Sequence, residues 1–226
     1  MRRVVTPELL DEDLGTPEEI RETLLDLRGL NRNFGGFRSV GGMLRTVAIK
    51  TGTPSLKLLD VAGGNGDVAD HVARQLLTEG IQIRATVLDR AVSHMSDHNG
   101  KLNRVAGDAL ALPFADRSFD VVSCNLFCHH LEPEEMIAFF NQALRVARLA
   151  VMASDLRRNA FHLLAAYAGR LTYRSRLTRN DAPASVRRAY TIAEIGEIAE
   201  RTSADSYDLS PHFFQRFGLI LWKAKR

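Results

Sequence analysis

The sequence predicts an α/β fold built on a doubly wound sheet, and three observations support it. Between residues 55 and 154, apolar runs of strand length alternate with helical segments, as expected when buried parallel strands are joined by helices. The first of these strands leads into a glycine-rich turn and the start of a helix. Near the end, the runs 207–214 and 217–225 are separated by only two residues, which predicts an antiparallel hairpin.

The N-terminal part predicts helices that precede the sheet. Residues 1–16 are polar, and we expect them to be mobile. Thr16 and Pro17 predict a helix start, because threonine is a good cap and proline suits the first helical position. This helix ends near residues 31–36, and a second helix is expected from about Val40 to Ile49.

The middle of the chain predicts five strands that alternate with helices. Each strand is a short apolar run, which is typical of strands covered on both faces. The strands are expected at residues 56–62, 83–89, 102–106, 118–127 and 146–154, and two of the helices at residues 67–77 and 133–145.

The region 155–190 interrupts this alternation. It holds eight arginines around an apolar helix, and regular structure resumes at Thr191 with a helix-capping sequence. We therefore expect one domain, with a helical insertion after the fifth strand. Its parts are an N-terminal helical cap (1–54), a core (55–154), a lid insertion (155–190) and a closing helix with a β-hairpin (191–226).

Composition argues against several classes of protein. The formal net charge of +3 is too small a bias to indicate a nucleic-acid partner. The spacing of Cys124 and Cys128 suits neither a secreted disulfide framework nor a zinc site. No segment has the composition of a signal peptide or of a membrane span. We therefore expect a soluble cytoplasmic protein without a metal site.

A glycine-rich loop is the strongest functional signal. Residues 58–67 read LLDVAGGNGD, so a buried strand ends in a tight turn whose glycines allow a ligand to approach the backbone. The next strand ends at Asp89, where an acid can accept hydrogen bonds from both hydroxyls of a ribose. NAD and S-adenosylmethionine both fit such a loop. Asp60 would repel a pyrophosphate and attract an ammonium group, so charge favours S-adenosylmethionine.

Three motifs in order carry a family resemblance. They are LLDVAGGNGDVA with Ala62 in the place of a glycine, ATVLDRA, and GDA followed by LPF and SFDVV. With them, residues 56–155 resemble the class I S-adenosylmethionine-dependent methyltransferases, and the first motif resembles that of the ubiquinone/menaquinone branch. The resemblance implies a seven-stranded sheet in the order 3-2-1-4-5-7-6 with strand 7 antiparallel. It implies cofactor contacts from Asp60, Ala62, Gly63, Gly64, Asn65, Gly66, Asp89, Arg90, Asp108, Ala109 and Asn125.

Two neighbouring histidines follow the fourth predicted strand. His129 and His130 lie in the loop after it, and Asp155 lies at the end of the adjacent fifth strand. Because the carboxyl ends of parallel strands meet at one edge, we expect one histidine to act as a base that Asp155 orients. His129 is preferred as the base, and the other histidine packs structurally. Activity would then rise through a histidine pKa near pH 6 to 7. Similar His-His-Leu loops occur in small-molecule O-methyltransferases.

The predicted acceptor is a small molecule, most plausibly phenolic or of the polyketide or quinone type, and methylated on oxygen. C- or N-methylation is the main alternative, followed by NAD-dependent oxidoreduction and a non-catalytic cofactor-binding module. The loop after the fourth strand lacks the [DN]PP[YFW] motif of methyltransferases that act on nucleic-acid amino groups or glutamine. The oligomeric state stays open, with a homodimer among the options. Candidate acceptor contacts are Asn31, Arg32, Arg157, Arg158 and Tyr173.

Overall fold

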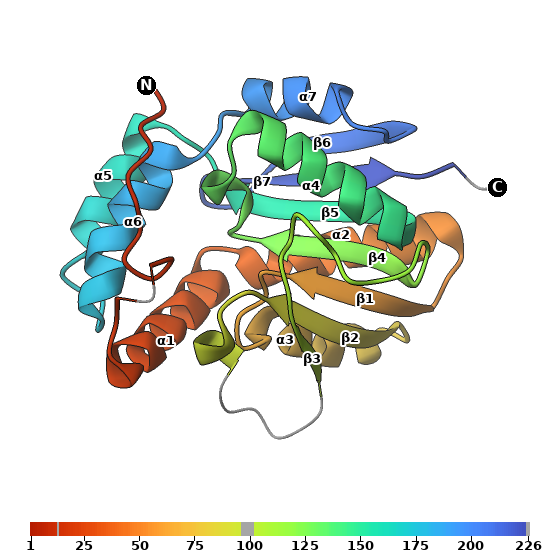
Figure 1. Cartoon of the computed structure of the whole chain (residues 1–226), viewed down its shortest axis with the longest axis horizontal. Coiled ribbons are helices and arrows are strands. Elements are labelled where there is room, and N and C mark those ends of the chain that lie inside the picture. Colours follow the sequence, from red (N-terminus) through yellow and green to blue (C-terminus); the bar gives the residue numbers. More distant parts are fainter. Residues whose placement is uncertain (13, 96–101, 225–226) are drawn as a thin grey trace.

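The sheet has the strand order that the sequence analysis expects. A computed structural model describes residues 1–12, 14–95 and 102–224, and in these residues the sheet order is β3-β2-β1-β4-β5-β7-β6 (Figure 1). Strand β7 is antiparallel to both of its neighbours, and the other pairs are parallel. The predicted α/β fold class is confirmed. The strands are β1 (Ser55–Val61), β2 (Gln82–Asp89), β3 (Asn103–Ala106), β4 (Phe119–Asn125), β5 (Ala147–Leu156), β6 (Ser206–His212) and β7 (Arg216–Trp222).

The connections diverge at the centre of the sheet. Strand β1 pairs with β2 on one side and with β4 on the other. The connections that follow β1 and β4 therefore run towards opposite edges of the sheet. Such a switch point leaves a crevice beyond the carboxyl ends of the strands. Val61, Asp89 and Asn125 mark these ends.

Helices cover both faces of the sheet (Figure 1). Successive strand residues point to opposite faces, so Val121 packs in the core under α2 and α3, whereas Val122 packs in the core under α4 and α7. No described helix is long and apolar enough to cross a membrane. The helices are α1 (Pro17–Asn33), α2 (Gly36–Thr51), α3 (Asp67–Leu77), α4 (Pro133–Val146), α5 (Ala160–Gly169), α6 (Arg176–Arg188) and α7 (Ile192–Glu200), with short 3₁₀ turns η1 (Val92–Met95) and η2 (Cys128–His130).

The predicted insertion and hairpin are both present, with different boundaries. Residues 155–190 contain two helices, α5 and α6, where the sequence suggested one apolar helix. The hairpin turn occupies residues 213–215, slightly before the predicted position, because Phe214 and Gln215 adopt positive φ angles of 49° and 56°. Helix α2 starts at Gly36, four residues earlier than expected, directly after Gly35 with a φ of 81°.

The segment 1–12 lies along α6 (Figure 1). The Val4 amide donates to the Arg187 carbonyl at 3.1 Å. The amides of Leu9 and Leu10 donate to the Asp181 carboxylate at 2.9 and 3.1 Å. We expected this segment to be mobile, but these long-range hydrogen bonds hold it against the insertion.

Candidate active site

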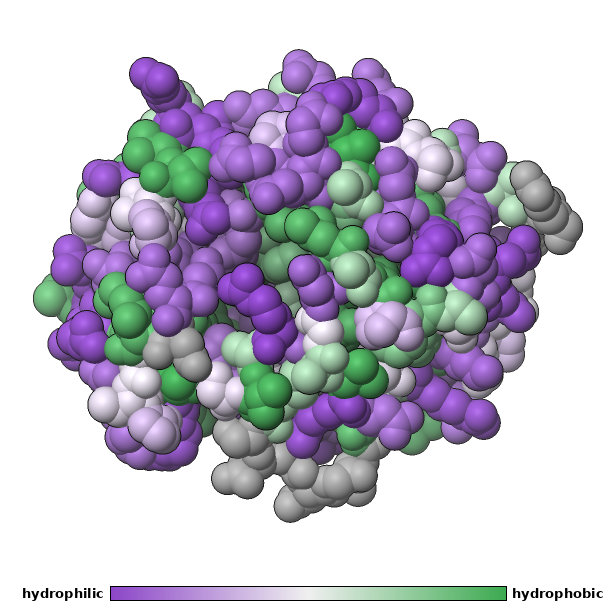
Figure 2. All heavy atoms as spheres, in the orientation of Figure 1, coloured by the Kyte–Doolittle hydropathy of each residue, from purple (hydrophilic) through white to green (hydrophobic). Residues whose placement is uncertain are grey.

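A pocket of about 1040 Å³ lies beyond the carboxyl ends of β1, β2 and β4. Its walls come from α1, the glycine loop, η2, the insertion and the segment 1–12. Leu24, Leu27 and Phe34 contribute apolar surface on the α1 side. The space-filling view shows a largely hydrophilic face with hydrophobic side chains gathered in its middle (Figure 2). The pocket is large enough for a cofactor together with a small acceptor.

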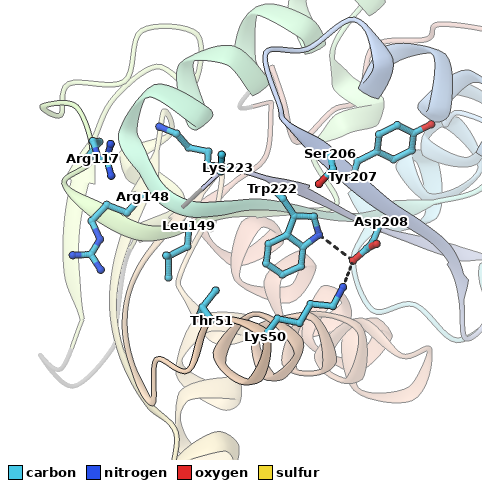
Figure 3. Close-up of a pocket in the computed structure, with 11 residues that line it drawn as sticks. Lys50, Thr51, Arg117, Arg148, Leu149, Ser206, Tyr207, Asp208, Trp222 and Lys223 are labelled. Carbon is cyan, nitrogen blue, oxygen red and sulfur yellow. Dashed lines mark hydrogen bonds and ion pairs between the residues drawn. The ribbon is translucent and has the colours of Figure 1, made fainter. Parts of the chain in front are cut away.

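A second hollow, of about 670 Å³, lies near the amino end of β5 (Figure 3). Its polar side chains interact with one another: Lys50 Nζ and the Trp222 indole N–H donate to the Asp208 carboxylate at 2.8 and 3.0 Å. Among the described residues that line it, none is a predicted site residue. The larger pocket is therefore the candidate active site.

The glycine loop turns tightly between β1 and α3. Ala62, Gly64 and Gly66 have φ angles of 54°, 55° and 83°. A Cβ atom on Gly66 would lie 2.7 Å from the Leu102 side chain, and one on Gly63 would lie 2.8 Å from a carboxylate oxygen of Asp60. Glycine is therefore required at both positions, by space and at Gly66 also by conformation.

Asp60 is a buried acid at the base of this loop. It is 3% exposed, lines the pocket and accepts a hydrogen bond from the Ser123 hydroxyl at 2.8 Å. Burial raises the pKa of Asp60 to about 6, although the Ser123 hydrogen bond acts in the opposite direction. At neutral pH the carboxylate is ionised and presents a negative charge to the pocket.

Two more acids follow the next two strands. One Asp89 oxygen accepts from the Gly64 amide at 2.8 Å, and the other accepts from the Ala91 amide at 2.9 Å. Asp108 follows β3 and accepts from the Leu110 amide at 2.9 Å. Both acids line the pocket, so Asp60, Asp89 and Asp108 lie around one cavity as predicted.

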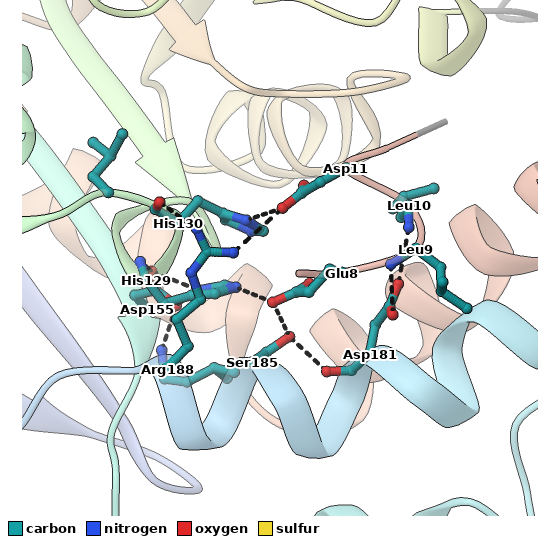
Figure 4. A network of polar contacts seen from close by, with 12 residues as sticks. Glu8, Leu9, Leu10, Asp11, His129, His130, Asp155, Asp181, Ser185 and Arg188 are labelled. Carbon is teal, nitrogen blue, oxygen red and sulfur yellow. Dashed lines mark hydrogen bonds and ion pairs between the residues drawn. The ribbon is translucent and has the colours of Figure 1, made fainter. Parts of the chain in front are cut away.

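His129 lies between two carboxylates (Figure 4). Its Nδ1 lies 2.8 Å from the Asp155 carboxylate, and its Nε2 lies 3.5 Å from that of Glu8. Burial opposes the charged imidazole, but the two carboxylates outweigh it and raise the pKa of His129 to about 10. His129 is therefore charged at neutral pH. The pH range of 6 to 7 expected from the sequence does not apply to it, and it cannot accept a proton there.

His130 has its own carboxylate partner (Figure 4). Its Nδ1 lies 2.6 Å from Asp11, and Arg188 lies 3.5 Å from the same carboxylate. Ser185 of α6 donates to Glu8 at 2.9 Å, so α6 helps to position the segment 1–12 at the histidines. The two histidine rings lie side by side, with centroids 4.1 Å apart.

A family model described as a methyltransferase domain matches residues 58–149, the part that carries the glycine loop and the three acids. Over these residues the chain is similar to the class I S-adenosylmethionine-dependent methyltransferases. The ubiquinone/menaquinone biosynthesis C-methyltransferase UbiE of Roseobacter denitrificans is 37% identical over 102 residues, 41% of this chain and 38% of that protein. A demethylmenaquinone methyltransferase of Roseiflexus is 28% identical over 49% of this chain and 46% of its own length. The chain thus spans less than half of the curated relatives that it matches.

Solved methyltransferases share the fold over most of the chain. A SAM dependent methyltransferase from Aquifex aeolicus has a TM-score of 0.63 at 15% identity, covering 92% of this chain and 98% of its own. The plantazolicin methyltransferase BamL, solved with SAH, has a TM-score of 0.67 at 14% identity, covering 91% and 97%. At these identities the similarity concerns the fold.

Most residues predicted for the cofactor line the pocket. Gly66 does not line it and instead shapes the loop at the start of α3. Of the predicted catalytic group, His129 and His130 line the pocket, whereas Asp155 lies behind His129 and is 1% exposed. The predicted cofactor residues in the lining are Asp60, Ala62, Gly63, Gly64, Asn65, Asp89, Arg90, Asp108, Ala109 and Asn125.

The predicted acceptor contacts divide into two groups. Asn31 and Tyr173 line the pocket, but Arg32, Arg157 and Arg158 lie outside its lining. Arg158 is buried because it forms an ion pair with Glu194 at 2.7 Å and donates to backbone carbonyls. Arg157 donates to Gln215 at 2.9 Å near the hairpin turn. Arg157 thus links the start of the insertion to the hairpin turn, and Arg158 links it to α7 and to Met1.

Several charged residues of the pocket escaped the sequence analysis, among them Glu8, Asp11 and Arg216. Glu8 and Asp11 lie in the segment 1–12, where an acid in a polar stretch gives no signal. Arg216 of β7 is 2% exposed and donates to Asn31 and Asn125 at 3.1 and 3.3 Å. It thereby links α1 to the end of β4. The sequence signal for Arg216 is its position as a charged residue at the start of an apolar strand.

Proposed function

We propose that this protein binds S-adenosylmethionine and transfers its methyl group to a small-molecule acceptor. One observation carries the proposal: Asp60 and Asp89 flank a glycine loop at the switch point of the sheet. Asp60 would attract the ammonium group of the cofactor, and a pyrophosphate in the same place would be repelled. Asp89 would accept the ribose hydroxyls, and Asp108 the adenine amino group. Ala62, Gly63, Gly64, Asn65, Arg90, Ala109 and Asn125 would line the rest of the cofactor site, with Gly66 shaping the loop.

Cofactor affinity should depend on the ionisation of Asp60. Because its pKa is raised to about 6, the carboxylate is charged at pH 8 and mostly neutral at pH 5. We expect S-adenosylhomocysteine to bind about tenfold more weakly at pH 5 than at pH 8, since only the charged form attracts its ammonium group. Calorimetry at both pH values measures this. Asp60→Asn should bind weakly at both, and equal wild-type affinities would show that Asp60 does not face the ammonium.

We propose that the acceptor carries a phenolic hydroxyl group and that methylation occurs on oxygen. The polar cluster of His129, His130, Glu8 and Asp11 supports this. A hydroxyl acceptor must lose its proton to a base, whereas a carbon acceptor depends less on a base. The named relatives favour a second candidate, C-methylation of a quinone-like compound. Asn31 and Tyr173 would contact the acceptor in either case.

The proposed reaction is an in-line displacement. The acceptor oxygen forms a bond to the methyl carbon, and the electron pair of the S–C bond returns to sulfur, which leaves S-adenosylhomocysteine. The hydroxyl proton passes to His130, whose Nδ1 is held by Asp11. Charged His129, positioned by Asp155, stabilises the negative charge on the oxygen.

The parts of the domain would divide this work. We propose that the core 55–154 holds the cofactor, while the cap 1–54 and the insertion 155–190 cover the acceptor side. The contacts of the segment 1–12 with α6 support this division. The closing part 191–226 would complete the sheet and contribute Arg216 to the pocket.

Two measurements test the function. Calorimetry should show binding of S-adenosylhomocysteine and no comparable binding of NADH, and the reverse result would overturn the cofactor. Incubation with S-adenosylmethionine and a panel of phenols and quinols should then yield a product heavier by one methylene. Carbon NMR of this product separates an O-methyl group from a C-methyl group. A C-methyl product would establish the second candidate.

A further inference from the structure

We propose that Glu8, His129 and His130 form a binding site for a divalent transition metal of the zinc type. One ligand atom from each residue lies within 4.8 Å of the other two (Figure 4). Two imidazoles and one carboxylate are a ligand set that suits Zn²⁺ with a further position open for water or substrate. The sequence analysis expected no metal site, because the third ligand is far from the histidines in the chain.

The spacing of the ligands favours an ion between them. Glu8 and His129 are 3.5 Å apart, longer than the hydrogen bonds around them, such as 2.8 Å from His129 to Asp155 and 2.9 Å from Ser185 to Glu8. Two ligand atoms at about 2.1 Å from a tetrahedral zinc lie about 3.4 Å apart. The gap between Glu8 and His129 therefore matches two ligands of one ion better than a direct hydrogen bond.

Both histidines are also oriented as metal ligands usually are. Asp155 faces the Nδ1 of His129, and Asp11 faces the Nδ1 of His130. A carboxylate that accepts the Nδ1 proton leaves the lone pair on Nε2 and raises its basicity, which is the common arrangement behind metal-bound histidines. Ser185 holds Glu8 in place from α6.

The charges of the surrounding residues call for a cation. The carboxylates of Glu8, Asp11 and Asp155 face the two imidazoles, and Arg188 is the cation that pairs with Asp11. Three negative charges against one positive charge leave an excess that a dication balances when both imidazoles are neutral. Burial of Glu8 and His129 strengthens this attraction, because few waters screen it.

The consequence for catalysis rests on the proposed function. Because the three ligands line the pocket, the open position of the ion would face the acceptor. A zinc ion held by these residues would lower the pKa of an acceptor hydroxyl that it coordinates, so that the proton would leave to water. His130, as a ligand of the ion, would then not accept that proton. With zinc bound, the metal takes the place of the Nε2 proton of His129 and carries the positive charge.

Calorimetry with zinc chloride on the full chain, after treatment with a chelator, tests the site. Wild type should bind one equivalent, and Glu8→Gln and His130→Ala should each weaken binding by at least about tenfold. Asp11→Asn, which keeps all three ligands, should weaken it by about 10- to 100-fold. Glu79→Gln and His71→Ala make the same chemical changes on side chains outside the pocket lining, and both should bind like wild type.

A second readout uses cobalt. Co²⁺ should give visible absorption typical of four or five ligands with wild type, and this spectrum should be lost in Glu8→Gln. Absence of zinc binding by wild type, or binding that none of the three site variants weakens, would overturn the proposal. Binding of S-adenosylhomocysteine by the same samples shows that the variants are folded and tests the cofactor site separately. Zinc binding without cofactor binding would reject the proposed function and leave the metal site standing.

Discussion

His129→Gln should lower kcat by about 10²- to 10³-fold. Glutamine can still hydrogen-bond to Asp155, but it carries no positive charge towards the acceptor oxygen, and removing one such group from a preorganised site has this effect. The cofactor residues are untouched, so the affinity for S-adenosylhomocysteine should stay near the wild-type value. Steady-state kinetics with a competent acceptor, together with calorimetry, measure both.

The pH dependence of His129 follows from its two carboxylate neighbours. Its pKa is raised to about 10, so the imidazolium is present below that value and is lost as pH rises through it. The contribution of His129 to the rate should therefore be constant between pH 6 and 9. His71→Gln is the matched control, because this histidine lies on α3 outside the pocket lining. An unchanged kcat in His129→Gln would indicate an acceptor that needs no charge stabilisation, which favours C-methylation.

Asp89→Ala should weaken the binding of S-adenosylhomocysteine by about 10²- to 10⁴-fold. Two hydrogen bonds from ribose hydroxyls to a carboxylate are lost, each worth about 1.5 to 3 kcal/mol. The loss also frees the Gly64 and Ala91 amides, which now donate to this carboxylate, so the glycine loop loses an anchor. Calorimetry measures the change.

The control for Asp89 is Asp208→Ala. Asp208 is also a hydrogen-bonded carboxylate at the sheet, but it lies in the second hollow, away from the cofactor pocket (Figure 3). Thermal unfolding of both variants separates lost affinity from lost structure. If Asp89→Ala binds the cofactor as wild type does, Asp89 does not face the ribose.

The cofactor side of the pocket was predictable because each of its residues lies in a short sequence pattern within one strand and the loop that follows it. Buried parallel strands give apolar runs. The sequence DVAGGNG at the end of such a run predicts that the strand is followed by a tight turn. Asp89 ends β2, and Asp60 lies one residue before the end of β1. The positions of these acids therefore followed from the strand boundaries together with the strand order that the resemblance supplied.

The acceptor side was less predictable because it depends on contacts between distant segments. Glu8 and Asp11 lie at the histidines because the segment 1–12 is held to α6 by contacts such as those of Leu9 and Leu10 with Asp181, and no periodicity in the sequence records these contacts. The raised pKa of His129 follows first from Asp155, which the sequence predicted as a partner, and then from Glu8, which it did not. Arg158 lies outside the pocket lining for a similar reason: it pairs with Glu194 of α7, which is distant in the sequence.

The docking of the segment 1–12 on α6 couples two processes at this site, the docking of the segment and the binding of the acceptor. If the segment also undocks, Glu8 and Asp11 would face the histidines only in the docked molecules, and turnover would scale with the docked fraction. The hydrogen bonds to Asp181 would contribute to this fraction, together with those of Val4 and Glu8. An acceptor that gains contacts with the docked segment would shift the fraction in its own favour. Selectivity among acceptors would then be decided partly by how well each one holds the segment closed.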